Sequence, residues 1–227
     1  MFEYEHIITQ PVFFLFIAFS FLLSLGYFWG RRQNKKIFLS VFNDIVDVVK
    51  PDDQTFTNIG GIIGYHANFL VKRKGPVSRI DATITLLPRH SWLYFPVSKL
   101  LIMKYDRLFI TLYLKHNPLG EGHLIESKYA GFRGPKITNE QRLNKETIKW
   151  GNRDFYLYYV NLKVRDHFIK FMELNPEPAI IKHIAIVPDQ KKSFVFMIPH
   201  RTKVAQYFAP IYQWLPSVIK QKEIEKK

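Results

Sequence analysis

The chain has 227 residues, with 33 Lys and Arg against 19 Asp and Glu, which gives a formal net charge of +14 at pH 7. With 47% hydrophobic and 23% charged residues, it is too apolar for an intrinsically disordered protein and long enough to bury a sizeable core. It contains no cysteine, which excludes a disulfide scaffold, a thiolate zinc site, an iron–sulfur cluster and a cysteine nucleophile within it.

The first predicted element is an apolar helix near the N-terminus. No charged residue occurs from Ile7 to Gly30, and Pro11–Trp29 consists mostly of Phe, Leu, Ile and Val. About 20 apolar residues cross a hydrocarbon core of about 30 Å, so we expect a transmembrane helix over 11–30 after a short extracytosolic segment, 1–10. A cleavable signal peptide fits less well, because an acidic segment precedes the apolar stretch and no small-residue cleavage site follows it.

The charges that flank this helix predict its orientation. Arg31, Arg32, Lys35 and Lys36 follow it directly, which favours an external N-terminus and a cytosolic C-terminal domain. Residues 31–227 carry a formal charge of +16, because the first 30 hold two Glu and no Lys or Arg. A domain with this charge, held at a membrane, attracts anionic lipid headgroups or nucleic acid.

The helix is expected to continue beyond the membrane. Apolar residues recur three or four positions apart from Ile37 to Val49, and a helix to Lys50 is expected to stop at Pro51. The neighbouring pair Asp52 and Asp53 is interpreted as a solvated turn rather than a metal site, since no carboxylate cluster lies nearby in the sequence.

Alternating and β-branched runs then predict an antiparallel meander. Gly60, Gly61 and Gly64 mark its first turn, and their spacing matches neither phosphate-binding glycine motif. A helix is expected over 96–105, and strands are expected over 56–59, 62–71, 80–87 and 107–115.

The second half predicts further strands and helices. The polar stretch Ala130–Lys149 is expected to be an extended surface loop. Strands are predicted over 155–159, 180–187 and 193–198, a helix over 161–174, and a C-terminal helical region with a charged tail over 204–227, interrupted near Pro210 and Pro216. The fold class is therefore α+β: one N-terminal transmembrane helix followed by a cytosolic domain, 31–203, of mainly antiparallel sheet with packed helices.

No pattern in the sequence indicates catalysis. The eight histidines form no H-E-x-x-H motif, and no G-x-S-x-G elbow or kinase loop is present. His66 and His183 fall in predicted strands and are interpreted as core or surface residues rather than metal ligands. We therefore expect a protein that is not an enzyme and that uses no metal or cofactor.

Basic clusters are the remaining signal. Three of the four lie in predicted turns or at a terminus, where side chains are free to meet phosphate. The first cluster is sufficiently explained by membrane topology, and for Lys72–Lys74 and Lys191–Lys192 a solvated turn and an RNA-contacting surface remain equal alternatives. No RRM or KH signature appears, so base-specific recognition is not indicated. The candidate ribosome- or RNA-binding residues are Arg31, Arg32, Lys35, Lys36, Lys72, Arg73, Lys74, Arg79, Lys191, Lys192, Lys220 and Lys222.

Small residues in the apolar helix are candidates for packing within the membrane. Ser20 and Ser24 are one helical turn apart, and together with Gly26 they form a face that suits a partner helix. Ordinary tolerance of small residues in a membrane helix explains the same pattern and is the preferred interpretation.

Dispersed residues over most of the chain carry a family resemblance. They are Gly30-Arg31-Arg32 with Asn34 and Lys36, the strand end Leu87–Arg89 followed by a helix and Asp106, and the hairpin of Ile184–Gln190 with Lys192–Ile198. In these positions the chain resembles the calumin family, the coiled-coil translocon-accessory subunit of the PAT complex.

The resemblance implies a non-enzymatic factor that assists insertion and folding of multi-pass membrane proteins. The implied partners are ribosomal RNA, a SecY-type channel with other small membrane accessory subunits, nascent multi-pass proteins and the lipid bilayer. The implied location is the endoplasmic reticulum in a eukaryote and the cell membrane in an archaeon. The family's long acidic lumenal segment and long basic coiled coil have no counterpart here, so the resemblance implies a minimal version, and calcium binding is unsupported.

A second hypothesis from another class is a membrane-anchored lipid-headgroup-binding domain, or an enzyme without a recognisable motif. It predicts a concave pocket with convergent polar residues. The position of the basic turns separates the two hypotheses, because a ribosome binder needs them far from the membrane and a lipid binder needs them beside it.

Overall fold

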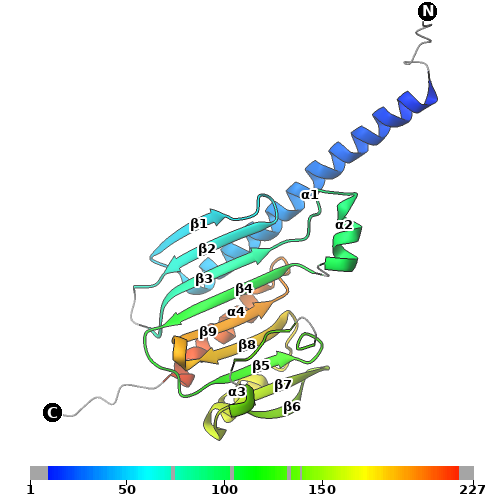
Figure 1. Ribbon diagram of the computed structural model, residues 1–227. Helices are drawn as coiled ribbons and strands as arrows, with labels where there is room; N and C mark the ends of the chain where they lie inside the picture. Colours follow the sequence, from blue (N-terminus) through cyan, green and yellow to red (C-terminus); the bar gives the residue numbers. More distant parts are fainter. Residues whose placement is uncertain (1–9, 73–74, 103–104, 132–133, 139, 220–227) are drawn as a thin grey trace, which may run out of the picture.

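A long helix and a sheet covered on one face by helices make up the molecule in the computed structural model, which describes residues 10–72, 75–102, 105–131, 134–138 and 140–219 (Figure 1). Helix α1 runs without interruption from Pro11 to Val49. Lys50 ends it in a left-handed conformation (φ 47°), and Pro51 follows. The predicted continuation of the apolar helix to this point is confirmed.

The two halves of α1 have different surroundings. The first half projects from the molecule with its large apolar side chains exposed, and it is long and apolar enough to cross a membrane. The second half packs on the domain, with Ile37, Val41, Ile45 and Val49 buried at the expected spacing of three or four residues.

The described strands form one antiparallel sheet of nine, in the order β1-β2-β3-β4-β9-β8-β5-β7-β6. The predicted α+β class with a mainly antiparallel sheet is confirmed. The strands are β1 (Asp53–Asn58), β2 (Gly64–Leu70), β3 (Val77–Thr85), β4 (Arg107–Leu114), β5 (Gly122–Glu126), β6 (Asn144–Trp150), β7 (Arg153–Tyr159), β8 (Ile181–Val187) and β9 (Lys192–Met197). The shorter helices are α2 (Tyr94–Val97), η2 (Ser98–Ile102), η3 (Glu140–Arg142), α3 (Leu162–Leu174), η4 (Pro188–Gln190), α4 (Val204–Trp214) and η5 (Leu215–Val218).

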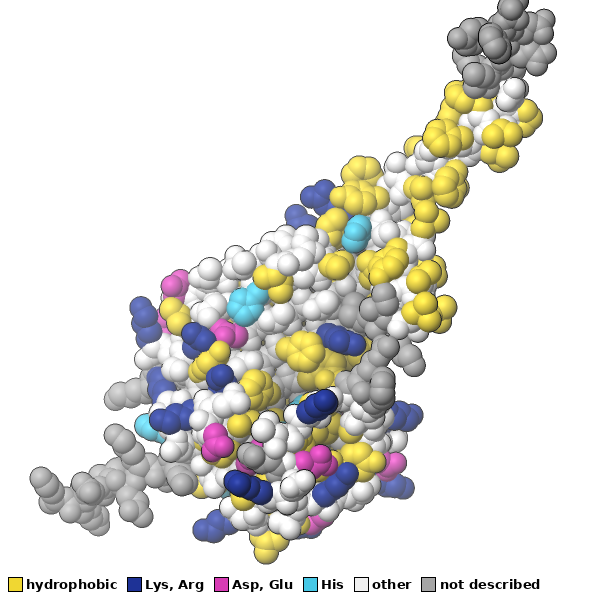
Figure 2. All heavy atoms as spheres, in the orientation of Figure 1, with side chains coloured by type: hydrophobic (Ala, Val, Ile, Leu, Met, Phe, Trp, Pro, Cys, Tyr) yellow, Lys and Arg dark blue, Asp and Glu magenta, His cyan; other side chains and the backbone are white. Residues whose placement is uncertain are grey.

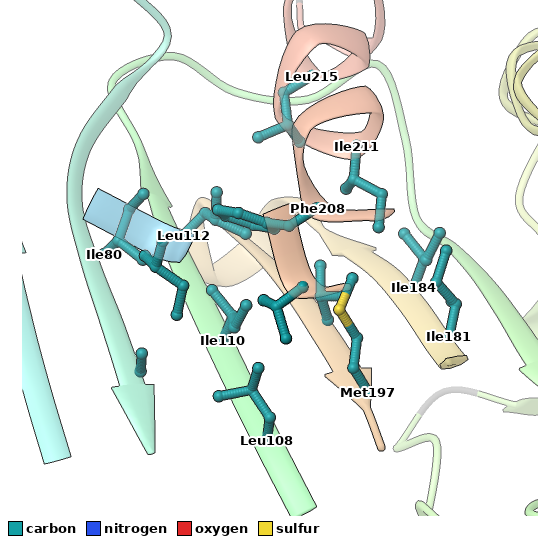
Figure 3. Close-up of a cluster of buried hydrophobic side chains, with 14 of the residues drawn as sticks. Ile80, Leu108, Ile110, Leu112, Ile181, Ile184, Met197, Phe208, Ile211 and Leu215 are labelled. Atoms are coloured by element: carbon teal, nitrogen blue, oxygen red, sulfur yellow. The ribbon is translucent and has the colours of Figure 1, made fainter. Parts of the chain in front are cut away.

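The core lies between one face of the sheet and the helices α1, α3 and α4. Figure 3 shows its centre, where Phe208 and Ile211 of α4 point toward Leu112 of β4 and Met197 of β9. These side chains are almost completely buried, and α4 also packs against α1. The second half of α1 is therefore part of the domain core and is not only a connection to the projecting half.

Two expectations for irregular structure were wrong. Ala130–Lys149 is not a loop throughout, because β6 occupies its end as an edge strand paired with β7. Its polar sequence misled because one face of this edge strand is exposed, while Ile148 and Trp150 pack on the core side. Helix α4 is not interrupted at Pro210, since that residue is accommodated inside the helix and the change to a 3-10 turn comes at Leu215.

The two ends of the strands are named here by their position relative to the projecting half of α1: the junction end lies beside it, and the distal end is the opposite one. At the junction end, the side chain of Asn34 in the middle of α1 donates to the carbonyl of Leu87, 2.9 Å away. At the distal end, just after α1, the N–H of Asp52 donates to the carbonyl of Leu70 at 2.9 Å. Helix α1 therefore runs along the sheet from its junction end to its distal end, as Figure 1 shows.

Candidate functional site

The sheet brings two of the basic clusters together at its distal end. Arg79 on β3 is in register with Tyr113 on β4, which is in register with Lys192 on β9. The guanidinium carbon of Arg79 lies 3.9 Å from the centroid of the Tyr113 ring, and Nζ of Lys192 lies 5.1 Å from the same centroid. Two cations share one aromatic ring, which fixes the position of both charges.

Two further lysines lie at this end of the sheet. Lys72 follows β2, and its N–H donates to Oδ2 of Asp52 at 2.7 Å. Lys191 closes the turn after η4 in a left-handed conformation (φ 50°), and its carbonyl accepts from the N–H of Leu114 at 2.8 Å. These hydrogen bonds fix the backbone of both turns, while the side chains of Lys72 and Lys191 are exposed. We call Lys72, Arg79, Lys191 and Lys192 the distal basic cluster.

Carboxylates offset part of this charge. Nη2 of Arg79 lies 3.1 Å from Oδ2 of Asp81, whose other oxygen accepts from the Asn68 amide at 2.6 Å. Asp52 and Asp189 are also exposed at the distal end. The lysines therefore supply the charge that is available to a polyanion, and Figure 2 shows Lys and Arg side chains at this end as well as over the rest of the domain.

The structure separates the other predicted cluster from this one. Arg31, Arg32, Lys35 and Lys36 are exposed on α1 at the junction end. From Lys36 to the end of the helix, α1 spans about 20 Å at 1.5 Å per residue, so the two basic surfaces are distinct. The remaining predicted residues, Arg73, Lys74, Lys220 and Lys222, lie outside the described residues.

The small residues of the projecting half of α1 have contacts within the chain. Oγ of Ser24 donates to the carbonyl of Ser20 at 2.9 Å, so its hydroxyl is satisfied inside the helix. Gly26 is buried, and a Cβ built on it would lie 2.4 Å from the indole of Trp92. The close approach at Gly26 is thus made by the domain's own segment after β3.

A polar network at the junction end joins α1 to the sheet. Asn34 is fully buried, and its Oδ1 accepts from Nη1 of Arg89 at 3.0 Å. Arg89 forms a bidentate ion pair with Asp106, with distances of 2.9 and 2.7 Å. Asp106 also accepts from the N–H of Leu87 at 2.7 Å. We call Asn34, Arg89 and Asp106 the junction clamp.

The junction clamp explains residues that the sequence singled out only through a family resemblance. Asn34, Arg89 and Asp106 lie 17 to 72 positions apart in the chain, yet all three meet in one network. A polar residue on the otherwise apolar buried face of a helix was the available signal, because such a residue needs a partner from elsewhere. Their role in this structure is to hold α1 against the sheet.

A cavity of about 290 Å³ lies on the face of the sheet opposite α4, below the segment 135–138. The rings of His123 on β5 and His183 on β8 face each other there, with centroids 5.7 Å apart. Nε2 of His123 lies 3.1 Å from Oε1 of Glu121, while Nδ1 of His123 and Nε2 of His183 are buried without a hydrogen-bond partner among the described residues. The sequence pattern did not connect these two histidines.

Burial keeps both histidines neutral. Desolvation, with a smaller contribution from His123, lowers the pKa of His183 to about 3. Desolvation also lowers the pKa of His123, although Glu121 opposes this shift. Within the described ranges, no group of three or more His, Asp or Glu is arranged to hold a metal ion. Two neutral rings can donate or accept hydrogen bonds in the cavity but supply no positive charge.

The similarity of the chain to known proteins is weak. No protein-family model matches it, and no curated protein matches it. Among solved structures, it is similar to the crystal structure of the mycobacterial trehalose monomycolate transport factor A, TtfA, with a TM-score of 0.38 and 14% sequence identity. That match covers 70% of this chain and 74% of the other, and a similarity of this size carries no argument about function.

Proposed function

We propose that the protein is a non-enzymatic, membrane-anchored factor that docks on the ribosome beside a SecY-type channel and assists insertion of multi-pass membrane proteins. In this proposal the projecting half of α1 is the single span, its N-terminus is external and the domain is cytosolic. Ribosomal RNA is the partner of the distal basic cluster. The proposed membrane is the endoplasmic reticulum in a eukaryote and the cell membrane in an archaeon.

The position of the distal basic cluster carries this proposal. It lies at the end of the sheet opposite the junction with the apolar half of α1, where a lipid-headgroup site would be out of reach of the same membrane. Exposed lysines on backbone-held turns suit phosphate contacts that do not depend on base sequence. The resemblance to the calumin family supports the same class of function.

A salt series tests the proposal. The full-length protein in detergent is co-sedimented with ribosomes, and we expect saturable binding that weakens steeply as salt increases. Simultaneous substitution Lys72→Glu, Lys191→Glu and Lys192→Glu should weaken binding about tenfold or more and reduce the salt slope. The control, Lys149→Glu with Lys163→Glu and Lys170→Glu, changes the net charge equally on exposed positions elsewhere and should retain binding. Equal losses in both variants would contradict a role for the cluster.

The cavity at His123 and His183 favours a second candidate, a small-ligand-binding domain. Its volume and its unpaired ring nitrogens fit a small, uncharged hydrogen-bonding ligand better than a phosphate, since both rings are neutral. A thermal-shift screen of neutral polyols and amides tests it. A rise in Tm that disappears in His183→Phe, with ribosome binding absent, would favour this candidate over the first.

A further inference from the structure

The segment between β3 and β4 exposes an unusual number of large apolar side chains. Residues 92–102, here called the apolar segment, contain α2 and η2. Leu100 is 76% exposed and Leu93 is 66% exposed, values that match those of the projecting half of α1. Water-soluble proteins rarely expose a contiguous patch of this kind. Its exposed large apolar residues are Trp92, Leu93, Tyr94, Val97, Leu100 and Leu101.

Close contacts hold the apolar segment beside α1. The indole of Trp92 lies against Gly26. The carbonyl oxygen of Arg89 lies 2.1 Å from the position that a Cβ on Gly30 would occupy. The rings of Tyr27 and His90 meet edge to face with centroids 5.9 Å apart. Two glycines one turn apart let the segment approach the helix backbone, and Figure 2 shows apolar side chains continuing from the projecting helix over the region of α2.

These contacts define the depth of the segment relative to the proposed span. A hydrocarbon core of about 30 Å takes about 20 residues, so a span that begins at Pro11 ends near Gly30. Gly26 is one turn earlier, about 6 Å inside that boundary. Trp92 therefore lies at the depth that interfacial segments reach, and Trp and Tyr are the residues that favour this level of a bilayer.

Charge along the same stretch agrees with this position. No acidic residue occurs between Asp81 and Asp106, and although Asp106 neutralises Arg89, the apolar segment still carries the cation Lys99. Lys99 is exposed next to Leu100 and can extend its ammonium group toward lipid phosphates while its methylenes stay among apolar neighbours. The stretch is thus apolar and basic, which complements an anionic bilayer surface.

We propose that the apolar segment lies in the cytosolic leaflet of the bilayer and forms a second membrane contact beside the span. The occupant of this surface is lipid, because the exposed side chains are continuous with the lipid-facing side of α1 and lie at its depth. The proposal rests on the membrane anchoring proposed above. A domain held by a span and an adjacent interfacial segment has a fixed orientation, with its distal basic cluster directed away from the membrane.

The chain's lack of cysteine makes a direct test possible. Single variants of the full-length protein, Leu100→Cys, Leu15→Cys and Leu174→Cys, carry a nitroxide spin label in vesicles of phosphatidylcholine with phosphatidylserine. Collision with oxygen, which concentrates in lipid, is compared with collision with a water-soluble nickel chelate. Leu15 is the control in the span, and Leu174, 72% exposed on α3, is the control that matches Leu100 in exposure.

We expect the oxygen-to-nickel ratio at position 100 to be several-fold higher than at position 174 and close to the ratio at position 15. A low ratio at position 100 with a high ratio at position 15 would overturn the inference while keeping the membrane anchor. Low ratios at both positions would contradict the anchor itself. A label at position 100 that neither reagent reaches would also overturn the inference, since protein rather than lipid would then cover the segment.

Discussion

Asn34 is the residue on which the attachment of α1 to the sheet depends. Its buried amide satisfies the carbonyl of Leu87 and a guanidinium N–H of Arg89. We expect Asn34→Leu to lower the free energy of unfolding by about 2–4 kcal/mol, because it leaves buried polar groups without partners. Urea denaturation checks this value. Asn43→Leu, at an exposed position of the same helix, is the control and should change stability by less than about 0.5 kcal/mol.

His183 predicts a pH dependence of stability. Its pKa is about 3 in the folded protein and about 6.5 in the unfolded chain, so only the unfolded state binds the proton between these values. Stability is therefore full above pH 6.5 and declines as the pH falls, by about 2 kcal/mol between pH 7 and pH 5 from this residue. Denaturation of His183→Gln should lose this part of the decline. An unchanged pH profile in the variant would show that His183 titrates normally.

At the scale of elements, the contact between α1 and the segment after β3 depends on Gly30. Gly30→Ala improves helix propensity, yet its Cβ would overlap the carbonyl of Arg89. We expect a net destabilisation of about 1–3 kcal/mol, measured by the shift in the urea midpoint. Gly75→Ala, where a Cβ would meet nothing within 4 Å, is the control and should be close to neutral. Stabilisation by Gly30→Ala would mean that the segment does not approach the helix this closely.

The elements that could be predicted from the sequence are those whose apolar residues recur at a clear helical or strand spacing. α3 could be placed because Asn161 caps it and its buried residues repeat at helical spacing, and β4 because its apolar residues alternate cleanly. β6 could not, since an edge strand with one exposed face is polar throughout much of its length. The order of strands also lay beyond the sequence, because β5 inserts between β8 and β7 through contacts distant in the chain.

At the scale of the whole molecule, the sequence predicted which basic residues belong to the candidate surface, but not that they lie close together. Arg79 and Lys192 were recognised as basic residues in turns, but only the register of β3, β4 and β9 puts both over Tyr113. The pairing of His123 with His183 was hidden for the same reason, as their strands are 60 residues apart in the chain. Local sequence identifies charge and periodicity, whereas the meeting of residues from distant strands depends on the order of strands in the sheet.

Because α1 is one continuous helix, its projecting half and the domain packed on its second half move together as a rigid unit. Because no proline follows its first residue and no change of helix type interrupts it between Pro11 and Val49, its two halves cannot kink sharply against each other without breaking backbone hydrogen bonds. With the proposed span in the membrane, the part of α1 from Gly30 to Lys50, about 30 Å long, sets the distance between the distal basic cluster and the bilayer. A tilt of the outer half by about 20°, a common angle for membrane helices, would swing the far end of the domain sideways by about 10 Å. In the proposed anchored state, the tilt of the outer half of α1 therefore sets how far the domain reaches sideways over the bilayer.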